Sequence, residues 1–170
     1  MALEHAAVPV LFALGTNLGD REANLRRAIG WLRGIATIDA VSAVYETAPM
    51  YVTDQASFLN MCVAARTVLA PEDLLPRLKQ AEAEIGRIPG RRNGPRLIDI
   101  DLLLYGDRTV DRPELVVPHP RMMERGFVLA PAADVAADWR HPVDGRSIGE
   151  LLQALGPLSG ITRRGDLDPA

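Results

Sequence analysis

The sequence has little of what a disulfide-stabilised or membrane-spanning protein needs. Its 170 residues include one cysteine, Cys62, so no disulfide can form within the chain. Cys62 lies in an apolar run, which favours a packed, unreactive thiol. The apolar run at residues 8–14 is too short for an export signal with its cleavage site. No apolar run in the sequence approaches the length of a membrane-spanning helix, which is about 20 residues. We therefore expect a soluble, cytoplasmic protein.

Aromatic residues and net charge are also scarce. Aromatic residues make up 5% of the chain. The formal net charge is −3, which argues against a protein whose whole surface binds nucleic acid. Apolar residues, at 48%, are plentiful enough for a buried core and argue against disorder. We expect one domain spanning residues 1–170, with residues 163–170 as a frayed tail.

Hydrophobic patterning predicts a short alternation of strands and helices. The expected strands are residues 8–14, 38–46, 58–68 and 98–105, and the expected helices are residues 23–32 and 71–85. Their order, βαββαβ, predicts a ferredoxin-like α+β sheet with both helices on one face. Extra C-terminal elements follow, including one helix for which Ser147 and Glu150 are spaced as a capping box.

The sharpest chemical signal is a pair of aspartates, Asp99 and Asp101, in the strand expected at residues 98–105. Side chains alternate along a strand, so the two carboxylates share one face, about 7 Å apart. The other face is expected to hold Ile98, Ile100, Leu102 and Leu104. Neighbouring carboxylates favour a cation between them, and Mg²⁺ takes carboxylate oxygen together with substrate phosphate. A solvated strand face is the alternative, and this pattern alone leaves both open.

A basic loop precedes the aspartates. Within ten residues it holds Arg87, Arg91, Arg92 and Arg96. A guanidinium group can donate two hydrogen bonds to two phosphate oxygens at once. Phosphoryl transfer typically uses carboxylates that bind a metal together with arginines that bind phosphate. A solvated loop is the alternative, strongest for Arg91 and Arg92 and weakest for Arg96 at the strand entrance.

Two further segments suggest a site only in combination with the first. His119 and Arg125 flank a short expected helical turn and can both donate to phosphate. Phe58 and Asn60 point the same way from one strand, and a ring beside an amide suits a flat heterocycle. Taken alone, the His119 segment is explained by a structural histidine, and the Phe58 segment by a surface phenylalanine beside a solvated asparagine. The turn at residues 15–20 is neither a Walker A loop nor a dinucleotide fingerprint.

Together these segments resemble the 6-hydroxymethyl-7,8-dihydropterin pyrophosphokinase family. The matching stretches are residues 13–20 (ALGTNLGD), 45–49 (YETAP), 58–60 (FLN), 86–87 (GR), 94–103 (GPRLIDIDLL), 118–122 (PHPRM) and 125–131 (RGFVLAP). The resemblance implies a ferredoxin-like fold. It also implies transfer of pyrophosphate from ATP to 6-hydroxymethyl-7,8-dihydropterin, giving AMP and the pterin diphosphate, in folate biosynthesis.

The resemblance also implies site roles. Asp99 and Asp101 would hold two Mg²⁺ ions that bridge ATP and the substrate hydroxyl. The residues implied in catalysis are Arg96, Asp99, Asp101, His119 and Arg125. Those implied in nucleotide binding are Glu82, Arg87, Arg96, Leu102, His119 and Arg125, with Arg87 on a loop that closes over the site. Those implied in pterin binding are Thr47, Ala48, Met50, Phe58, Asn60 and Phe127, the two phenylalanines enclosing the ring.

Two departures from the family pattern concern the closing loop. Asn93 stands where the family usually has tryptophan, and Pro89 where it often has a second arginine. Two other classes of protein compete with the kinase. An RNA-binding ferredoxin-like module would need aromatic residues on its central strands, and a non-catalytic ligand-binding domain would have no use for paired aspartates. We expect a monomer that binds small molecules and neither nucleic acid nor membrane.

Overall fold

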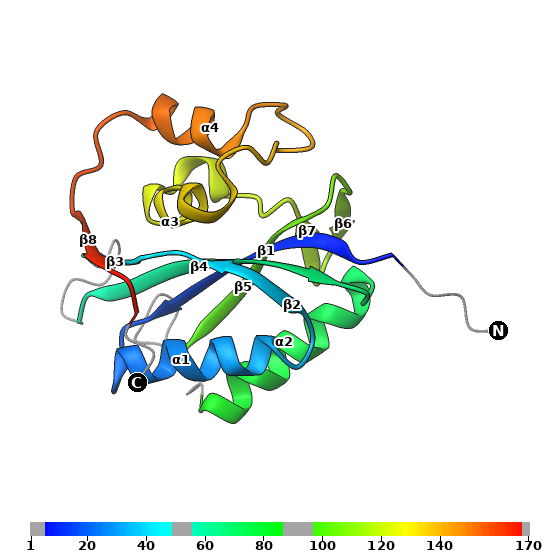
Figure 1. Ribbon diagram of the computed structural model, residues 1–170, viewed down its shortest axis with the longest axis horizontal. Coiled ribbons are helices and arrows are strands. Elements are labelled where there is room, and N and C mark those ends of the chain that lie inside the picture. The colour runs from blue at the N-terminus through cyan, green and yellow to red at the C-terminus, as the bar shows by residue number, and fades with distance from the viewer. Residues whose placement is uncertain (1–5, 49–55, 87–96, 168–170) are drawn as a thin grey trace.

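The computed structural model describes residues 6–48, 56–86 and 97–167, and its centre is an antiparallel sheet. The strands are β1 (Val8–Thr16), β2 (Thr37–Val41), β3 (Val44–Thr47), β4 (Phe58–Thr67), β5 (Asp99–Tyr105) and β8 (Ile161–Gly165). Their order is β5-β1-β4-β3-β8, and β2 also pairs with β4. Figure 1 shows this sheet between two helical layers. The predicted ferredoxin-like α+β class is confirmed.

Helices α1 (Arg21–Leu32) and α2 (Pro71–Ile85) cover one face of the sheet, as the βαββαβ order predicts (Figure 1). The Asp20 carboxylate accepts the Ala23 N–H at 3.1 Å and caps α1. Pro71 opens α2 at a position where its missing N–H costs nothing, and Gly86 ends it with φ 107°, a left-handed conformation that glycine adopts readily.

The two C-terminal helices cover the opposite face (Figure 1). A hairpin of β6 (Val110–Arg112) and β7 (Leu115–Val117) leads through the short 3-10 helix η1 (Met122–Glu124) into α3 (Gly126–Ala136) and α4 (Ile148–Leu155). The predicted capping box of α4 is confirmed, since the Ser147 hydroxyl accepts the Glu150 N–H at 3.1 Å. Helix α3 was not predicted, because it is apolar on most sides and begins without a capping side chain.

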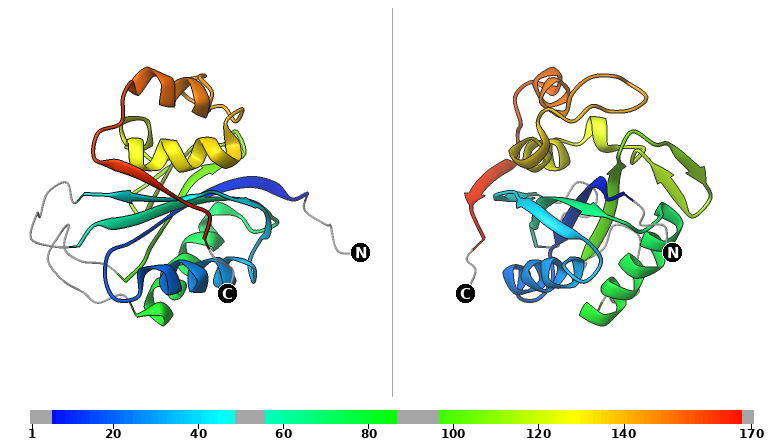
Figure 2. Two further views of the ribbon diagram at one scale, coloured as in Figure 1. Left: turned by 60° about the vertical axis from the view of Figure 1, so that its left-hand side comes forward. Right: turned by 45° about the vertical axis from the view of Figure 1, so that its right-hand side comes forward.

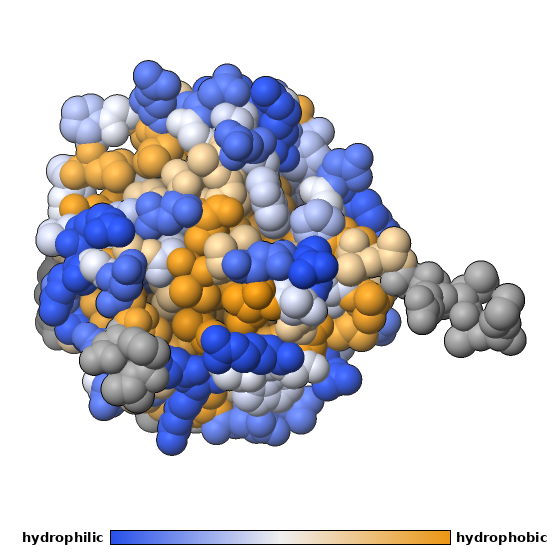
Figure 3. Space-filling model, in the orientation of Figure 1, coloured by the Kyte–Doolittle hydropathy of each residue, from blue (hydrophilic) through white to orange (hydrophobic). Residues whose placement is uncertain are grey.

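Each face of the sheet has its own core. Val10, Phe12 and Leu14 of β1 pack toward α1 and α2, whereas Leu11 packs toward α3 and α4. In the space-filling view, apolar side chains show in the band between the two helical layers (Figure 3). The period-two alternation of β1 therefore serves two cores, because helices cover both of its faces.

Strand β5 departs from the predicted alternation at its C-terminal end. Leu11 of β1 pairs with Leu104, whereas the next residue, Phe12, pairs with Leu102, so β5 has one extra residue. Leu102 packs toward α1 and α2, but Leu103 and Leu104 both pack toward α3 and α4. The shared aliphatic face that was expected therefore ends at Leu102, and its extension to Leu104 is wrong because of this bulge.

Two further expectations needed correction. The single strand expected at residues 38–46 is divided into β2 and β3 near Ser42, whose hydroxyl accepts the Cys62 N–H at 2.8 Å. The tail expected to fray from Arg163 instead contributes residues to β8, which pairs with β3. That pairing joins segments more than a hundred residues apart, so no local sequence pattern predicts it. None of the helices that the structure describes is long and apolar enough to cross a membrane.

Candidate active site

The two aspartates lie on the edge strand β5 and share the face that α3 and α4 cover. Across the ladder Asp99 pairs with Gly15 and Asp101 with Ala13 of β1, and both aspartates are half-buried. Ile100 between them is 2% exposed and packs into the opposite core. The local sequence enforces this arrangement, because burying Ile100 on one side directs both carboxylates to the other.

Glu82 of α2 stabilises β5 between the two aspartates. Its carboxylate is buried, accepts the Ile100 N–H at 2.9 Å and pairs with Lys79 Nζ at 3.2 Å. An edge strand leaves backbone donors without a ladder partner, and Glu82 satisfies the one that lies between the aspartates. Helix α2 therefore holds this part of β5 in place, while the contact of Glu82 with a nucleotide stays a prediction.

His119 follows β7 and is attached to β5 through its backbone. Its N–H donates to the Leu103 carbonyl at 3.0 Å, and its Nδ1 accepts the Arg121 N–H at 3.2 Å. Burial, and then the positive charges of Arg125 and Arg121, lower the pKa of His119 to about 4. At neutral pH the imidazole is uncharged. Because Nδ1 accepts, the proton lies on Nε2, which is a donor.

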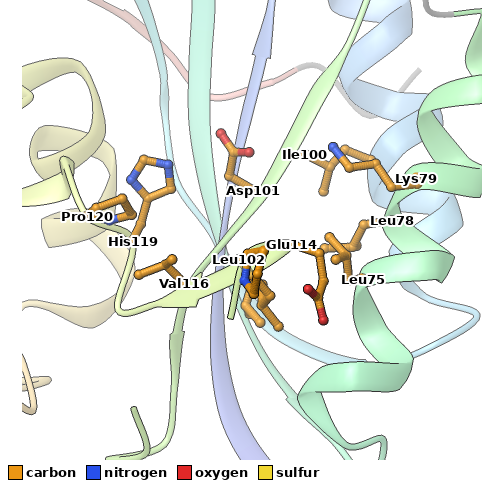
Figure 4. A pocket seen from close by; sticks show the side chains of 12 residues that line it. Leu75, Leu78, Lys79, Ile100, Asp101, Leu102, Glu114, Val116, His119 and Pro120 are labelled. Carbon is orange, nitrogen blue, oxygen red and sulfur yellow. The ribbon is translucent and has the colours of Figure 1, made fainter. Parts of the chain in front are cut away.

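A cleft of about 240 Å³ runs along β5 beside these groups. Its polar lining is Asp101, His119, Lys79 and Glu114. The remaining lining is apolar and consists of Leu75, Leu78, Ile100, Leu102, Pro113, Leu115, Val116 and Pro120. Figure 4 shows Asp101 and His119 extending toward the same side of the cleft, with Lys79 of α2 on its other wall. An apolar cleft with a few polar groups at its rim suits a small ligand.

Arg125 stands at the junction of η1 and α3. Its guanidinium carbon lies 5.6 Å from the centre of the Phe127 ring, a cation–π arrangement. Its carbonyl accepts the Leu129 N–H at 2.9 Å and so begins α3. Arg121, by contrast, lies on the surface and pairs with Glu124 at 2.7 Å. The fold thus holds Arg125 in a half-buried position, whereas Arg121 remains largely exposed.

An amide lies on the same face as the carboxylates, two strands away. Asn60 of β4 is buried, pairs with Gly15 of β1, and donates from its Nδ2 to the Thr47 hydroxyl of β3. A Cβ on Gly15 would lie 3.3 Å from Asn60 Oδ1 and 3.9 Å from Phe58 Cδ1. Glycine therefore leaves an open floor between Asp99 and Asn60, which two strand spacings separate by about 10 Å.

The predicted site residues fall into two groups and a remainder. Asp99, Asp101, Leu102 and His119 lie at β5 and its cleft, with Glu82 behind the strand. Thr47, Ala48, Phe58 and Asn60 lie at the adjoining ends of β3 and β4, and Phe127 begins α3. Arg87, Arg96 and Met50 lie outside the described residues, as do Pro89 and Asn93.

Sequence reasoning missed three residues around this site. Lys79 and Glu114 line the cleft, and Gly15 forms the floor. Lys79 precedes Glu82 by one helical turn, a spacing that puts both on one side of α2 and was a usable signal. The position of Gly15 opposite Asn60 follows from strand register, which the sequence alone does not reveal.

The lowered pKa of His119 predicts a pH-dependent stability. Because the unfolded chain protonates this imidazole near pH 6.5 and the folded one only near 4, the free energy of unfolding should fall as the pH drops through that interval. Allowing for partial exposure, we expect a loss of about 1 to 2 kcal/mol. Urea unfolding of the metal-free protein and of His119→Asn at neutral and mildly acidic pH measures it. Parallel pH profiles for the two proteins would contradict this assignment.

Fold and site together define a ferredoxin-like α+β protein with the components of a phosphoryl-transfer site: paired carboxylates, a neutral histidine and a positioned arginine beside a cleft. The family model described as 7,8-dihydro-6-hydroxymethylpterin-pyrophosphokinase (HPPK) matches residues 11–137. The chain belongs to this family.

Curated relatives agree with the family match. The chain is 49% identical over 125 residues to a 2-amino-4-hydroxy-6-hydroxymethyldihydropteridine pyrophosphokinase of Bacillus subtilis, covering 72% of this chain and 75% of that protein. It is 43% identical over 156 residues to the Pseudomonas aeruginosa protein of the same name, covering 91% and 95%. A mitochondrial folate synthesis bifunctional protein of Pisum sativum is 44% identical over 169 residues, with 92% of this chain but 32% of that protein covered.

Solved structures share the fold. The wild-type HPPK-DHPS of Plasmodium falciparum with pteroate superposes with a TM-score of 0.76 at 15% identity, covering 93% of this chain and 48% of that one. The A437G form with STZ-DHP gives 0.75 at 16% identity, covering 90% and 46%. This chain thus spans less than half the length of those chains, and the likeness extends to the fold alone.

Proposed function

We propose that this chain transfers pyrophosphate from ATP to 6-hydroxymethyl-7,8-dihydropterin, the reaction of its family in folate biosynthesis. The observation that carries this proposal is the arrangement on one face of the sheet. Carboxylates on β5 and an amide on β4 stand on either side of Gly15. A metal–phosphate site and a ring site placed side by side bring a hydroxyl on the ring next to the phosphate that it attacks.

The ring site is formed by the ends of β3 and β4 and the start of α3. Asn60 Oδ1 faces Gly15, where it can accept an N–H from the pterin edge, while its Nδ2 is held by the Thr47 hydroxyl. Phe58 and Phe127 supply aromatic faces for a flat ring. Ala48, and Met50 outside the described residues, complete the predicted wall. Fixing the amide on one side gives it one orientation toward the ring.

The carboxylate pair fits Mg²⁺ by the chemistry of its donors. Asp99 and Asp101 offer carboxylate oxygens, the donors that Mg²⁺ prefers. Among the described residues, no group of three or more His, Cys, Asp and Glu side chains could hold a metal ion by itself, so the pair would need further ligands from water and substrate. Mg²⁺ commonly takes one or two carboxylates and completes its shell with water and substrate phosphate. When bound, such ions neutralise phosphate charge and act as Lewis acids. Two Mg²⁺ ions at this pair remain part of the proposal.

The cleft along β5 is the proposed site of ATP, with Leu102 in its apolar wall and Glu82 behind it. The pterin hydroxyl oxygen attacks the β-phosphorus and releases its proton to solvent, the bond from that phosphorus to the bridging oxygen of the α-phosphate breaks, and AMP leaves with that oxygen. Charge that develops on the phosphate oxygens requires donors. Arg125 supplies a guanidinium, and His119 supplies the Nε2–H of a neutral imidazole. Arg87 and Arg96, beyond the described residues, are the further predicted donors.

The experiment that tests the function is an assay of AMP release. With ATP, Mg²⁺ and 6-hydroxymethyl-7,8-dihydropterin present, we expect one AMP for each pterin diphosphate formed. Omission of the pterin, or removal of Mg²⁺ with a chelator, should stop the release. Release of ADP, or binding of ATP and pterin without turnover, would contradict the proposal and favour a non-catalytic binding domain. A monomer in the cytoplasm that binds no nucleic acid stays a prediction.

A further inference from the structure

Residues 156–165, which we call the C-terminal clamp, contact both walls of the proposed pterin site. The clamp comprises the turn after α4 and strand β8, and it lies beyond residues 11–137, which the family model matches. In Figure 2 it descends from α4, passes the start of α3 and runs beside β3. We infer that the clamp is a positioning element that sets the separation of these walls. The inference rests on the proposed pterin site.

The first wall is the end of β3, and the clamp forms its outer neighbour. Thr47 pairs with Phe58 of β4 on one side and with Ile161 of β8 on the other. The Ala48 N–H donates to the Gly160 carbonyl at 3.3 Å. Without the clamp this end of β3 would be an open strand edge, and such edges are held by fewer hydrogen bonds. The clamp therefore fixes the backbone that carries the hydroxyl bound to Asn60.

The second wall is the start of α3, on which the clamp packs directly. A Cβ on Gly126 would lie 2.7 Å from Leu158 Cδ2 and 3.0 Å from Ile161 Cδ1. Only glycine admits so close an approach without displacement of its neighbours. Phe127, the proposed aromatic wall, is the next residue. Leu158 and Ile161 therefore determine how far the first turn of α3 can move from the sheet.

Helix α3 has a separate attachment near its other end. The Asp134 carboxylate accepts the Tyr45 hydroxyl at 3.0 Å and the Ala43 N–H at 3.2 Å, both from the start of β3 or just before it. Leu158 and Ile161 pack in the same small cluster as Tyr45. The polar bonds thus hold the later turns of α3, and the clamp holds the first turn, which bears Phe127.

A third connection reaches the residue before Phe58. Arg164 of the clamp pairs with Glu46 at 2.7 Å, and the other oxygen of Glu46 pairs with Arg21 at 2.9 Å. Arg21 also donates to the Ser57 carbonyl at 2.9 Å. Arg21, and then Arg164, lower the pKa of Glu46, so this carboxylate stays charged at neutral pH. Through these ion pairs the clamp is linked to the residue that precedes β4.

The carboxylates and the cleft of the nucleotide side are remote from the clamp, whereas Arg125 directly precedes Gly126. Strands β5 and β8 are the opposite ends of the strand order β5-β1-β4-β3-β8, and Asp99, Asp101 and the cleft belong to β5. A ring enclosed between two aromatic walls is sensitive to their spacing, because stacking needs a narrow range of separations. Loosening the clamp should therefore weaken pterin binding much more than ATP binding, to which Arg125 is the one neighbouring contributor among the described residues.

The test compares two half-buried leucines, Leu158 of the clamp and Leu69, which packs toward α1 and α2. Leu158→Ala removes the contact with Gly126, whereas Leu69→Ala removes the same atoms from the core on the other face of the sheet. Pterin affinity is measured with a saturating non-hydrolysable ATP analogue and Mg²⁺ present, and analogue affinity without pterin. We expect Leu158→Ala to weaken pterin binding on the order of tenfold, with a much smaller change in analogue affinity. Leu69→Ala should alter neither, and the similarly sized Leu158→Met should retain pterin binding.

The outcomes separate failure of the clamp from failure of the proposed site. If Asn60→Ala loses the pterin but Leu158→Ala keeps it, the clamp is overturned and the site stands. If Asn60→Ala binds pterin normally, the site is misplaced and the inference falls with it. An equal loss of pterin and analogue in Leu158→Ala also overturns the clamp. Should Leu158→Ala not fold, Arg164→Ala, at an exposed position, replaces it, and unchanged pterin affinity in that variant counts against the inference.

Discussion

Changing Asp101 to asparagine is expected to lower turnover by on the order of 1,000-fold or more, and Asp99→Asn should act alike. Asparagine keeps the shape of the side chain and removes the charge proposed to bind Mg²⁺. Ile100 stays buried between the two positions and Glu82 still holds its N–H, so the strand itself should be preserved. The loss should therefore appear in kcat, measured by AMP release at saturating ATP and pterin.

Two controls make this result specific to the metal site. Asp107→Asn changes an exposed aspartate in the turn just after β5 and should leave turnover unchanged. Pterin affinity of the Asp101 variant should remain measurable, because Asn60 lies two strands away from β5. Near-normal turnover in either the Asp99 or the Asp101 variant would refute the assignment of these carboxylates to Mg²⁺.

Removal of the Arg125 side chain should give the second largest effect, a fall in kcat on the order of 100-fold or more. Arg125 is positioned by its ring contact with Phe127 and by its place at the start of α3, so we expect its guanidinium to reach the phosphates without rearrangement. Arg125→Lys should also be impaired, because a lysine ammonium cannot donate to two phosphate oxygens as a guanidinium does.

Arg121→Ala is the matched control for this prediction. Arg121 lies four residues away and pairs with Glu124 on the surface, where ion pairs contribute little. We expect its kcat to stay close to that of the parent protein. Because Arg125→Ala also removes a contact to Phe127, pterin affinity must be measured for both variants. If kcat fell further in Arg121→Ala than in Arg125→Ala, the proposed contact of Arg125 with the phosphates would be refuted.

Local chemistry determined several features that the sequence could predict. The cap at Asp20, the proline that opens α2 and the capping box at Ser147 each follow from residues within one helical turn. The placement of Asp99 and Asp101 on one face follows from alternation over three residues. The βαββαβ order followed from periodicity in each segment, and the family from the order of its motifs.

Tertiary structure decided what depends on pairing between distant segments. The bulge that turns Leu104 to the other core reflects the match between β1 and β5, and Gly15 lies opposite Asn60 only in the observed register. Strand β8 forms because β3 offers an edge and Glu46 offers a partner for Arg164. Helix α3 forms from an apolar segment because it buries that segment against the sheet face that α1 and α2 do not cover. Local sequence specifies caps and alternation through neighbouring atoms, whereas register and layer contacts depend on surfaces that exist only once the chain has folded.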